Sequence, residues 1–500
     1  MSEKEAAQSK VPENPHRGVE TTRVFKLAGG EISARVVADW LDIHEKNKPK
    51  ARMFHTAYLA EEADPDRPVV FCINGGPGAS SVFLHFACAG PMAVPRDANG
   101  QFDGANRSLL GNPDSWLSFA DLVFIDPIGT GFSHLIEAEP KENEDKTKPK
   151  SEDADTNPYW ATGKDLDSIG QFMRRFMRQH KLWRRPLYFA GESYGGYRTC
   201  RMAKRLHRDY GLGTAGVISI SPIWQFRDTS SSDNSTSQWV NQLPTYAAIA
   251  HENGIGRHFA KDADMATVLE EAEQFSISDF AQALVAGRLM PAKQSETIWN
   301  TVADMMGLDR DFVSSASGRI MMHDYGRMVR KEHGEIVDLY DGSQYSLDPF
   351  PHRTSNGEAI ENALFHFFHI FQNALHQWYF EELGVETPLE YTLLNFDAFK
   401  QWKNDEKELD MFELPSSVED FRIGMAGNPN MRAMIVHGRF DMVTPYFASK
   451  RILNQVNMDA RVRERIEERL YEGGHMFYSW PHVNAEFAQD VAEFVSDGER

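Results

Sequence analysis

This sequence of 500 residues is poor in cysteine, in excess positive charge and in long apolar runs. Its three cysteines, Cys72, Cys88 and Cys200, are too few for a disulfide framework, and an odd number cannot all be paired. We therefore expect a reducing, cytoplasmic setting. Lys and Arg number 53 against 73 Asp and Glu, a net charge of −20, which disfavours nucleic acid and anionic membranes as partners. No apolar run approaches the roughly 18 residues of a membrane span, and the polar N-terminal stretch shows no signal peptide.

Composition along the chain predicts an α/β core interrupted by an insertion. Residues 1–20 are polar and are expected to be a disordered tail. Strand-like runs and helical patterns alternate over residues 21–225 and return over residues 413–500, the two parts of the predicted core. The region 226–412 is rich in helical patterns and is predicted to be a mainly helical cap. The charged stretch 137–158 is expected to be an exposed loop.

The stretch LYFAGESYGGYRTC, residues 187–200, places one serine at a change from strand to helix. Four apolar residues predict a buried strand, and the pattern after the glycine pair Gly195-Gly196 predicts a helix. Either the turn simply needs small residues, or Ser193 is held out as a nucleophile. Gly191-x-Ser193-x-Gly195 matches the nucleophile elbow, which exposes a serine hydroxyl on a sharp strand-to-helix turn. The strand before and the helix after favour the second interpretation.

A serine hydroxyl needs a base to remove its proton, and the elbow motif expects an acid and then a histidine further along the chain. IVHGRFDMVTP places Asp441 just beyond a predicted strand, and YEGGHMFYSW places His475 on a glycine-rich turn. Taken singly, Asp441 is explained as a turn residue and His475 as an ordinary loop histidine. Their joint occurrence in this order favours a Ser-Asp-His triad.

The stretch FCINGGPGASS, residues 71–81, predicts an oxyanion hole, because glycines after a strand let backbone N–H groups approach a substrate. The expected donors are the N–H groups of Gly76 and of Tyr194, the residue after the proposed nucleophile. A phosphate-binding loop is the alternative interpretation, but no Lys-Ser/Thr pair follows the glycines.

These motifs, in order and at similar spacing, resemble the serine carboxypeptidases, the family of cathepsin A and yeast carboxypeptidase. The resemblance rests on NGGPGASS, NPDSWLSFADLVFIDPIGTGFS, GESYGG, HGRFDMVTP and GGHMFY. Residues 312–342 are more similar to bacterial members. The resemblance implies an α/β-hydrolase fold, with a central, mostly parallel sheet flanked by helices and a mainly helical cap. It also implies release of the C-terminal residue from peptides with a free C-terminus, without a cofactor or a metal.

Carried over position by position, the resemblance makes Ser193 the nucleophile, His475 the general base and acid, and Asp441 the residue that orients the imidazole. Three further positions match the group that holds the substrate's C-terminal carboxylate: Asn74, the backbone at Gly75, and Glu192. Glu192 must carry a proton to donate a hydrogen bond to another carboxylate.

Two positions depart from the family pattern. Ala79 stands where the family usually has a disulfide cysteine, which agrees with a reducing compartment. Cys88 falls where the family has a second glutamate. Without this like-charged partner we expect Glu192 to ionise more readily. Unless burial of Glu192 compensates, we therefore expect a weaker preference for C-terminal acids over amides than in two-glutamate relatives, and a less acidic pH optimum of kcat/KM.

Other functions on the same scaffold remain open from the sequence. An esterase, a plant-type acyltransferase, or an aminopeptidase of the proline-releasing group with its GGPG loop would share most of these motifs. Asn74 and Glu192 favour recognition of a free C-terminus. A non-catalytic scaffold protein is disfavoured by the intact triad positions.

Overall fold

The computed structural model describes residues 16–61, 64–104, 108–136, 157–229, 232–352, 362–404 and 415–497. Most of the predicted tail (residues 1–15) and of the predicted charged loop (residues 137–156) therefore lies outside the described residues. The prediction of disorder is wrong for residues 16–20. Strand β1 begins at Val19, and the N–H of Arg17 donates to the carbonyl of Glu386 over 2.9 Å.

Ten strands among the described residues form one central sheet. In spatial order, nine of them are β1 (Val19–Leu27), β2 (Gly30–Glu45), β3 (Lys48–Ala60), β7 (Asp121–Ile125), β4 (Val69–Ile73), β9 (Leu187–Glu192), β10 (Thr214–Ile220), β13 (Arg432–Gly438) and β14 (Ile466–Tyr471), and β8 (His134–Leu135) pairs with β3. The first three strands are antiparallel, whereas β7 to β14 run parallel. The expected mostly parallel sheet is confirmed.

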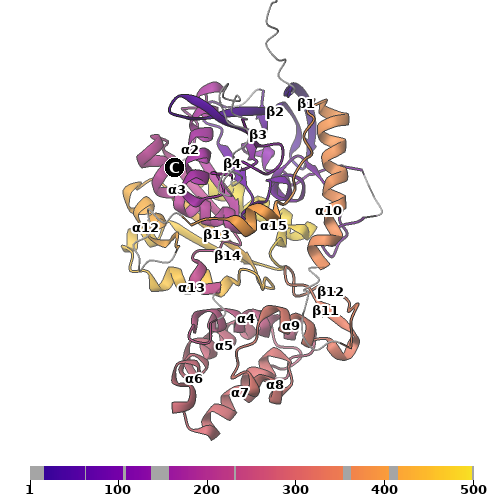
Figure 1. The fold of residues 1–500 in the computed structure, drawn as a ribbon, viewed down its shortest axis with the longest axis vertical. Coiled ribbons are helices and arrows are strands. Elements are labelled where there is room, and N and C mark those ends of the chain that lie inside the picture. The colour runs from indigo at the N-terminus through magenta and orange to yellow at the C-terminus, as the bar shows by residue number, and fades with distance from the viewer. Residues whose placement is uncertain are drawn as a thin grey trace, which may run out of the picture.

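Helices cover both faces of the sheet, because its central strands are apolar on both sides. Successive side chains of a strand point to opposite faces. Phe71 of β4 accordingly packs with α2 (Thr162–Gln179) and α3 (Tyr194–Tyr210). Its neighbour Cys72 packs in the cluster that contains α15 (Pro481–Asp497) and the π-helical turn η1 (His85–Ala89). Figure 1 shows this layered core in the upper part of the molecule.

The cap forms a separate lobe below the core (Figure 1). It contains α4 (Ser237–Glu252), α5 (Met265–Phe275), α6 (Ala281–Ala286), α7 (Ala292–Met306), α8 (Arg310–Ser315), α9 (Met322–Met328) and the hairpin β11 (Glu335–Val337) and β12 (Tyr345–Leu347). These elements share a hydrophobic cluster of their own, which also includes Phe440, Met442 and Tyr446 from the core. The cap is therefore joined to the core next to Asp441.

The later part of the predicted cap interval packs on the core instead. Helix α10 (Asn362–Leu375) and its π-helical continuation η8 (His376–Leu383) place Phe371 and Trp378 in the same cluster as the sheet. The remaining elements include α1 (Val82–Leu84), β5 (Met92–Ala93), β6 (Leu110–Gly111), α11 (Phe396–Gln401), α12 (Val418–Gly427), α13 (Tyr446–Gln455) and α14 (Ala460–Arg463). The lobe with its own core thus extends from α4 to β12, a shorter interval than residues 226–412.

Candidate active site

The three predicted triad residues follow neighbouring strands of the parallel sheet. Ser193 comes directly after β9, Asp441 follows β13, and His475 follows β14. The carboxyl ends of parallel strands meet at one edge of the sheet, where α/β proteins build their sites. The end of β10 is hydrogen-bonded to the loops that carry Ser193 and His475. The N–H of Ser193 donates to the carbonyl of Ile220 (2.9 Å), and the hydroxyl of Ser221 donates to the carbonyl of His475 (2.9 Å).

The elbow at Ser193 has the geometry that its glycines allow. Ser193 has φ 60° and ψ −119°, a left-handed conformation that costs energy for a residue with a Cβ. A Cβ at Gly191 would lie 2.2 Å from the carbonyl oxygen of Gly195, and one at Gly195 would lie 2.5 Å from that of Ile73. Only glycine fits at either position. Ser193 is partly exposed, whereas its neighbours Glu192 and Tyr194 are buried.

Asp441 and His475 form a buried pair, with 2.7 Å between Oδ2 and Nδ1. The other carboxylate oxygen of Asp441 accepts the N–H groups of Val443 (2.8 Å) and Thr444 (3.0 Å), and the Thr444 hydroxyl donates to Oδ2 (2.6 Å). Burial by itself would raise the pKa of Asp441, but the imidazole and the Thr444 donors keep it below its usual value. Burial by itself would lower the pKa of His475. The opposing effects, chiefly those of the Asp441 carboxylate, are together larger than the effect of burial, so the pKa of His475 is raised. The pair is suited to hold an imidazolium during catalysis.

A loop of the cap touches the imidazole. The backbone N–H of His475 donates to the backbone carbonyl of Tyr340 over 2.5 Å. The imidazole of His475 and the ring of Tyr340 pack edge to face, with centroids 5.3 Å apart. In the same loop, the backbone carbonyl of Leu339 accepts the backbone N–H of Met442 (3.2 Å). A Cβ at Gly474 would lie 1.9 Å from the Tyr340 carbonyl oxygen. The cap therefore contributes directly to the position of the imidazole.

The predicted oxyanion donors lie side by side. Gly75 packs so closely on the elbow that an added Cβ would lie 2.5 Å from the nitrogen of Tyr194. Gly76 has φ +99° and Gly78 has φ +106°, conformations that favour glycine. Within the part of the chain that the structure describes, neither the N–H of Gly76 nor that of Tyr194 makes a hydrogen bond. Both are available to a developing negative charge.

Glu192 lies buried between Asn74 and Tyr478. The amide of Asn74 donates to one carboxyl oxygen, and the hydroxyl of Tyr478 lies 2.6 Å from the other. The carbonyl oxygen of the Asn74 side chain accepts the N–H of Leu84 (3.0 Å), which orients the amide. Burial raises the pKa of Glu192 to about 7, against opposing effects of the His475 charge and of both hydrogen-bond partners.

The expectation that Glu192 ionises more readily than in relatives with a second glutamate stays a prediction, and the structure shows that burial acts against this ionisation. Cys88 is buried on η1, close enough to Glu192 for the two groups to interact electrostatically, and burial raises the pKa of its thiol. It supplies no charge to hold the proton on Glu192. Removal from water takes over this role, because a carboxylate in an apolar setting loses its hydration.

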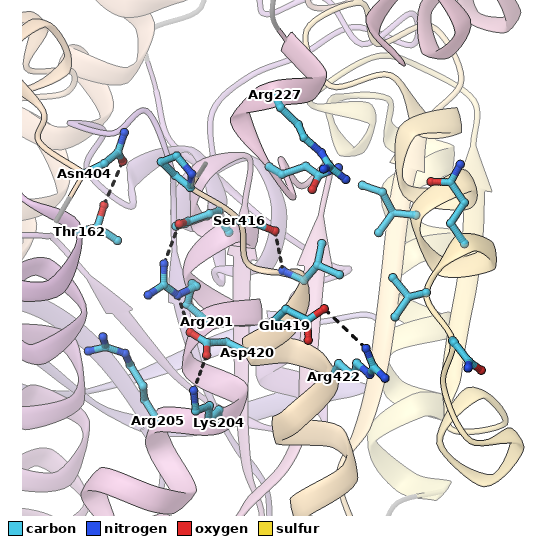
Figure 2. Close-up of a pocket in the computed structure, with 18 of the residues that line it drawn as sticks. Thr162, Arg201, Lys204, Arg205, Arg227, Asn404, Ser416, Glu419, Asp420 and Arg422 are labelled. Atoms are coloured by element: carbon cyan, nitrogen blue, oxygen red, sulfur yellow. Dashed lines mark hydrogen bonds and ion pairs between the residues drawn. The ribbon is translucent and has the colours of Figure 1, made fainter. Parts of the chain in front are cut away.

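A pocket of about 910 Å³ lies between α3 and α12, and no predicted site residue lines it. Figure 2 shows its charged wall, in which Arg201 and Lys204 both contact Asp420 (2.6 and 2.7 Å) and Arg422 lies 3.6 Å from Glu419. Much of the positive charge is therefore matched by neighbouring carboxylates. Among the described residues, no cluster of His, Cys, Asp or Glu can hold a metal ion, and no helix has the length and apolar character to cross a bilayer.

Sequence reasoning missed the partners that complete the site. Thr444 stands three residues after Asp441, and Tyr478 three residues after His475, inside motifs already singled out. Their proximity to the triad was a usable signal. Tyr340 had no such signal, because it reaches the site from the cap.

The parallel sheet, the elbow at Ser193 and the Asp441–His475 pair define this chain as an α/β hydrolase. The family model described as serine carboxypeptidase matches residues 29–474. The chain belongs to the serine carboxypeptidase family.

Curated relatives agree with this assignment, and a solved structure agrees with the fold. The chain is similar to serine carboxypeptidase S10 family member 1 of Dictyostelium discoideum, with 28% identity over 34% of this chain and 36% of that protein. It is also similar to serine carboxypeptidase-like 50 of Arabidopsis thaliana, with 24% identity over 59% of this chain and 55% of that protein. The matches thus span about a third to about a half of these relatives' lengths. The fold is similar to that of Kex1(delta)p, a prohormone-processing carboxypeptidase from Saccharomyces cerevisiae, with a TM-score of 0.54, 13% identity, and coverage of 93% of this chain and 92% of that one.

Proposed function

We propose that this protein is a cofactor-free serine carboxypeptidase that releases the C-terminal residue of peptides through an acyl-enzyme. The observation that carries the proposal is the buried carboxyl of Glu192 next to the elbow, which contacts Asn74 and Tyr478 and whose pKa is raised by burial to about 7. A neutral carboxyl can donate a hydrogen bond to a substrate's terminal carboxylate, whereas an ionised one repels it.

In the proposed reaction, the hydroxyl of Ser193 attacks the carbonyl carbon of the last peptide bond while His475 takes its proton. Asp441 keeps the Nδ1 proton facing itself, so Nε2 is free to act as the base. The N–H groups of Gly76 and Tyr194 stabilise the oxyanion. Imidazolium then protonates the leaving amino group, and water, activated by the same imidazole, hydrolyses the acyl-enzyme.

Recognition of the free C-terminus is assigned to Asn74, the N–H of Gly75, and Glu192. All three lie on the two segments that also carry the proposed oxyanion donors. A carboxylate bound there would hold the last peptide bond next to Ser193. This position explains why only one residue would be removed in each cycle.

The test compares an N-blocked dipeptide with its C-terminal amide at pH 6. We expect kcat/KM to be about 10- to 100-fold higher for the acid, the value of one to two charge-assisted hydrogen bonds. Ser193→Ala should abolish both hydrolysis and labelling by a fluorophosphonate. Equal rates for acid and amide would overturn recognition of a free C-terminus, cleavage of esters but of neither peptide would favour an esterase, and cleavage that requires a free N-terminus would favour an aminopeptidase. Absence of labelling in the unmodified protein would favour a scaffold function.

Two finer predictions accompany this proposal. A cytoplasmic location is supported by Ala79, which stands at the family's disulfide cysteine, and by the free, buried state of all three cysteines. A closer relation to bacterial members is supported by the likeness of residues 312–342.

A further inference from the structure

Arg198 is a charged residue that lies wholly inside the protein. It stands on α3, five residues after Ser193, and its relative exposure is 0%. Its Nε and Nη2 atoms donate to the two carboxylate oxygens of Asp165 on α2, over 2.8 and 3.1 Å. A buried ion pair has to offset a large loss of hydration. The pair therefore needs an explanation beyond the joining of two helices.

The third nitrogen of the guanidinium points at the substrate loop. Nη1 donates to the carbonyl of Asn74 over 2.8 Å and has a longer contact of 3.5 Å with the carbonyl of Gly75. The carbonyl of Asn74 and the N–H of Gly75 belong to one peptide unit, and the carbonyl of Gly75 and the N–H of Gly76 belong to the next. The cation thus touches the rear of the two peptide groups whose N–H ends face the proposed substrate.

Two consequences follow from this contact. A fixed cation at a carbonyl oxygen orients the peptide plane, so the N–H on its other side has one direction. It also withdraws electrons from the peptide group, which strengthens the N–H as a donor, since chains of hydrogen bonds polarise one another. The shorter contact is on the Asn74–Gly75 unit, so the larger effect is expected there.

The surroundings keep this interaction strong. The guanidinium lies over the ring of Tyr194, 4.9 Å from its centroid, and 5.9 Å from that of Trp402. The indole N–H of Trp402 donates to the hydroxyl of Tyr194 over 3.0 Å. These rings exclude water from one side of the cation, and electrostatic interactions gain strength where water is absent.

We propose that Arg198, anchored by Asp165, is a positioning residue that orients and polarises the peptide groups of the Asn74–Gly76 loop. Through the N–H of Gly75 it supports binding of the substrate's terminal carboxylate, and more weakly through the N–H of Gly76 it supports the oxyanion. This inference rests on the proposed function.

The test uses the double variant Arg198→Met with Asp165→Asn, which removes both charges and leaves no buried ion without a partner. The matched control is Arg201→Met with Asp420→Asn. Arg201 is on the same helix, pairs with an aspartate (2.6 Å) and lies over a tyrosine ring, but lines the pocket of Figure 2 instead of the loop. Active sites are counted with a fluorophosphonate, and kcat and KM are measured per titrated site for a dipeptide acid and its amide.

For the Arg198 double variant we expect KM for the acid to rise about tenfold, the loss of one strengthened hydrogen bond, with KM for the amide nearly unchanged. The kcat for both substrates should fall by a smaller factor, and the control should keep the acid-to-amide ratio of the unmodified protein. If the double variant does not fold, Arg198→Lys serves instead. Its single ammonium cannot serve both Asp165 and Asn74 as the fork of the guanidinium does, so the same change in ratio is expected.

If the Arg198–Asp165 ion pair were purely structural, its removal would lower the thermal midpoint and the number of active sites that the fluorophosphonate titrates. The kcat and KM per titrated site and the acid-to-amide ratio would stay unchanged. That result, in either variant, would overturn the inference. Absence of any acid preference in the unmodified protein would instead overturn the proposed function.

Discussion

Asp441 contacts the imidazole of His475 through one oxygen, so a single substitution tests its role. Asp441→Asn keeps the shape, but its amide oxygen is needed to accept the N–H groups of Val443 and Thr444, so the amide N–H₂ faces Nδ1. The favoured imidazole tautomer then carries its proton on Nε2, where it cannot accept the proton of Ser193. We expect kcat to fall by about 10⁴-fold, measured on the dipeptide acid at pH 7 with unchanged circular dichroism.

Thr444→Val is the control for this prediction. It removes the hydroxyl that donates to Asp441 Oδ2 but leaves the carboxylate facing the imidazole, so a loss of only about tenfold is expected, comparable to one hydrogen bond. An Asp441→Asn variant with activity near that of the unmodified protein would mean that another carboxylate is the third member of the triad.

The second prediction concerns the pH dependence of KM and kcat/KM, to which the ionisation of Glu192 contributes. Its pKa is raised to about 7, so it is neutral below this value and ionises as the pH rises through it. KM for a peptide acid should therefore increase above about pH 7. The pKa of His475 is also raised, and the imidazole must be neutral, so kcat/KM should fall on the acid side. The profile is expected to be bell-shaped, with limits that belong to the coupled pair.

Glu192→Gln separates the two limits. Glutamine keeps a hydrogen-bond donor at every pH, so KM for the acid should no longer rise above pH 7. A KM profile that is the same in the variant and the unmodified protein would show that the proton on Glu192 does not control binding. The amide substrate is the internal reference, since it carries no terminal charge.

At the scale of elements, the loop between β11 and β12 joins cap and core at the imidazole. Gly474→Ala places a methyl group where the Tyr340 carbonyl lies, 1.9 Å away, and 2.4 Å from the Cα of Asp341. The loop must shift, and a displacement of about 1 Å near the reacting groups costs up to about 10²-fold in rate. We expect kcat/KM to fall by at least about tenfold while the protein stays folded, measured on the dipeptide acid.

Gly427→Ala, at the end of α12, is the matched substitution, because an added Cβ there meets nothing within 4 Å. Its activity should equal that of the unmodified protein. Full activity of Gly474→Ala would mean that the cap loop does not help to hold His475.

At the scale of the whole molecule, buried histidines make the folded protein less stable under the acidic conditions in which Glu192 is protonated. His55 packs edge-on against Phe172 and Phe176, and burial lowers its pKa to about 3. In the unfolded chain its pKa is about 6.5. Its contribution to stability is therefore present above pH 6.5 and is lost as the pH falls, because the unfolded chain takes up a proton that the folded protein does not.

His55→Leu tests this effect on stability. Relative to the unmodified protein, the variant should gain about 1.4 kcal/mol on going from pH 7.5 to pH 5.5, seen as a convergence or crossing of the two thermal midpoints. A difference between the midpoints that is constant with pH would show that the pKa of His55 is the same in the folded and the unfolded state. With the requirement for a protonated Glu192, this places the working range close to neutral pH.

Features that depend on local backbone geometry and on chain order could be predicted from the amino-acid sequence. The strand, glycines and helix around Ser193 predict the elbow, because only glycine fits at 191 and 195. The order of Ser193, Asp441 and His475, the first two after apolar strands and the third on a glycine-rich turn, predicts the triad loops, and the helix-rich interval predicts a cap. These features are the ones that the fold reproduces.

The charge state of the site and the residues that support it depend on contacts between distant parts of the chain. Burial, which depends on the whole surrounding core, raises the pKa of Glu192 to about 7, and a count of carboxylates along the chain does not reveal this effect. Tyr340 reaches His475 from a lobe whose loop has no motif, and α10 packs on the core although its pattern reads like that of the cap. Arg198 is buried where a sequence would place it on an exposed helix face, because its partners, Asp165 and the Asn74 carbonyl, lie 33 and 124 positions away in the chain.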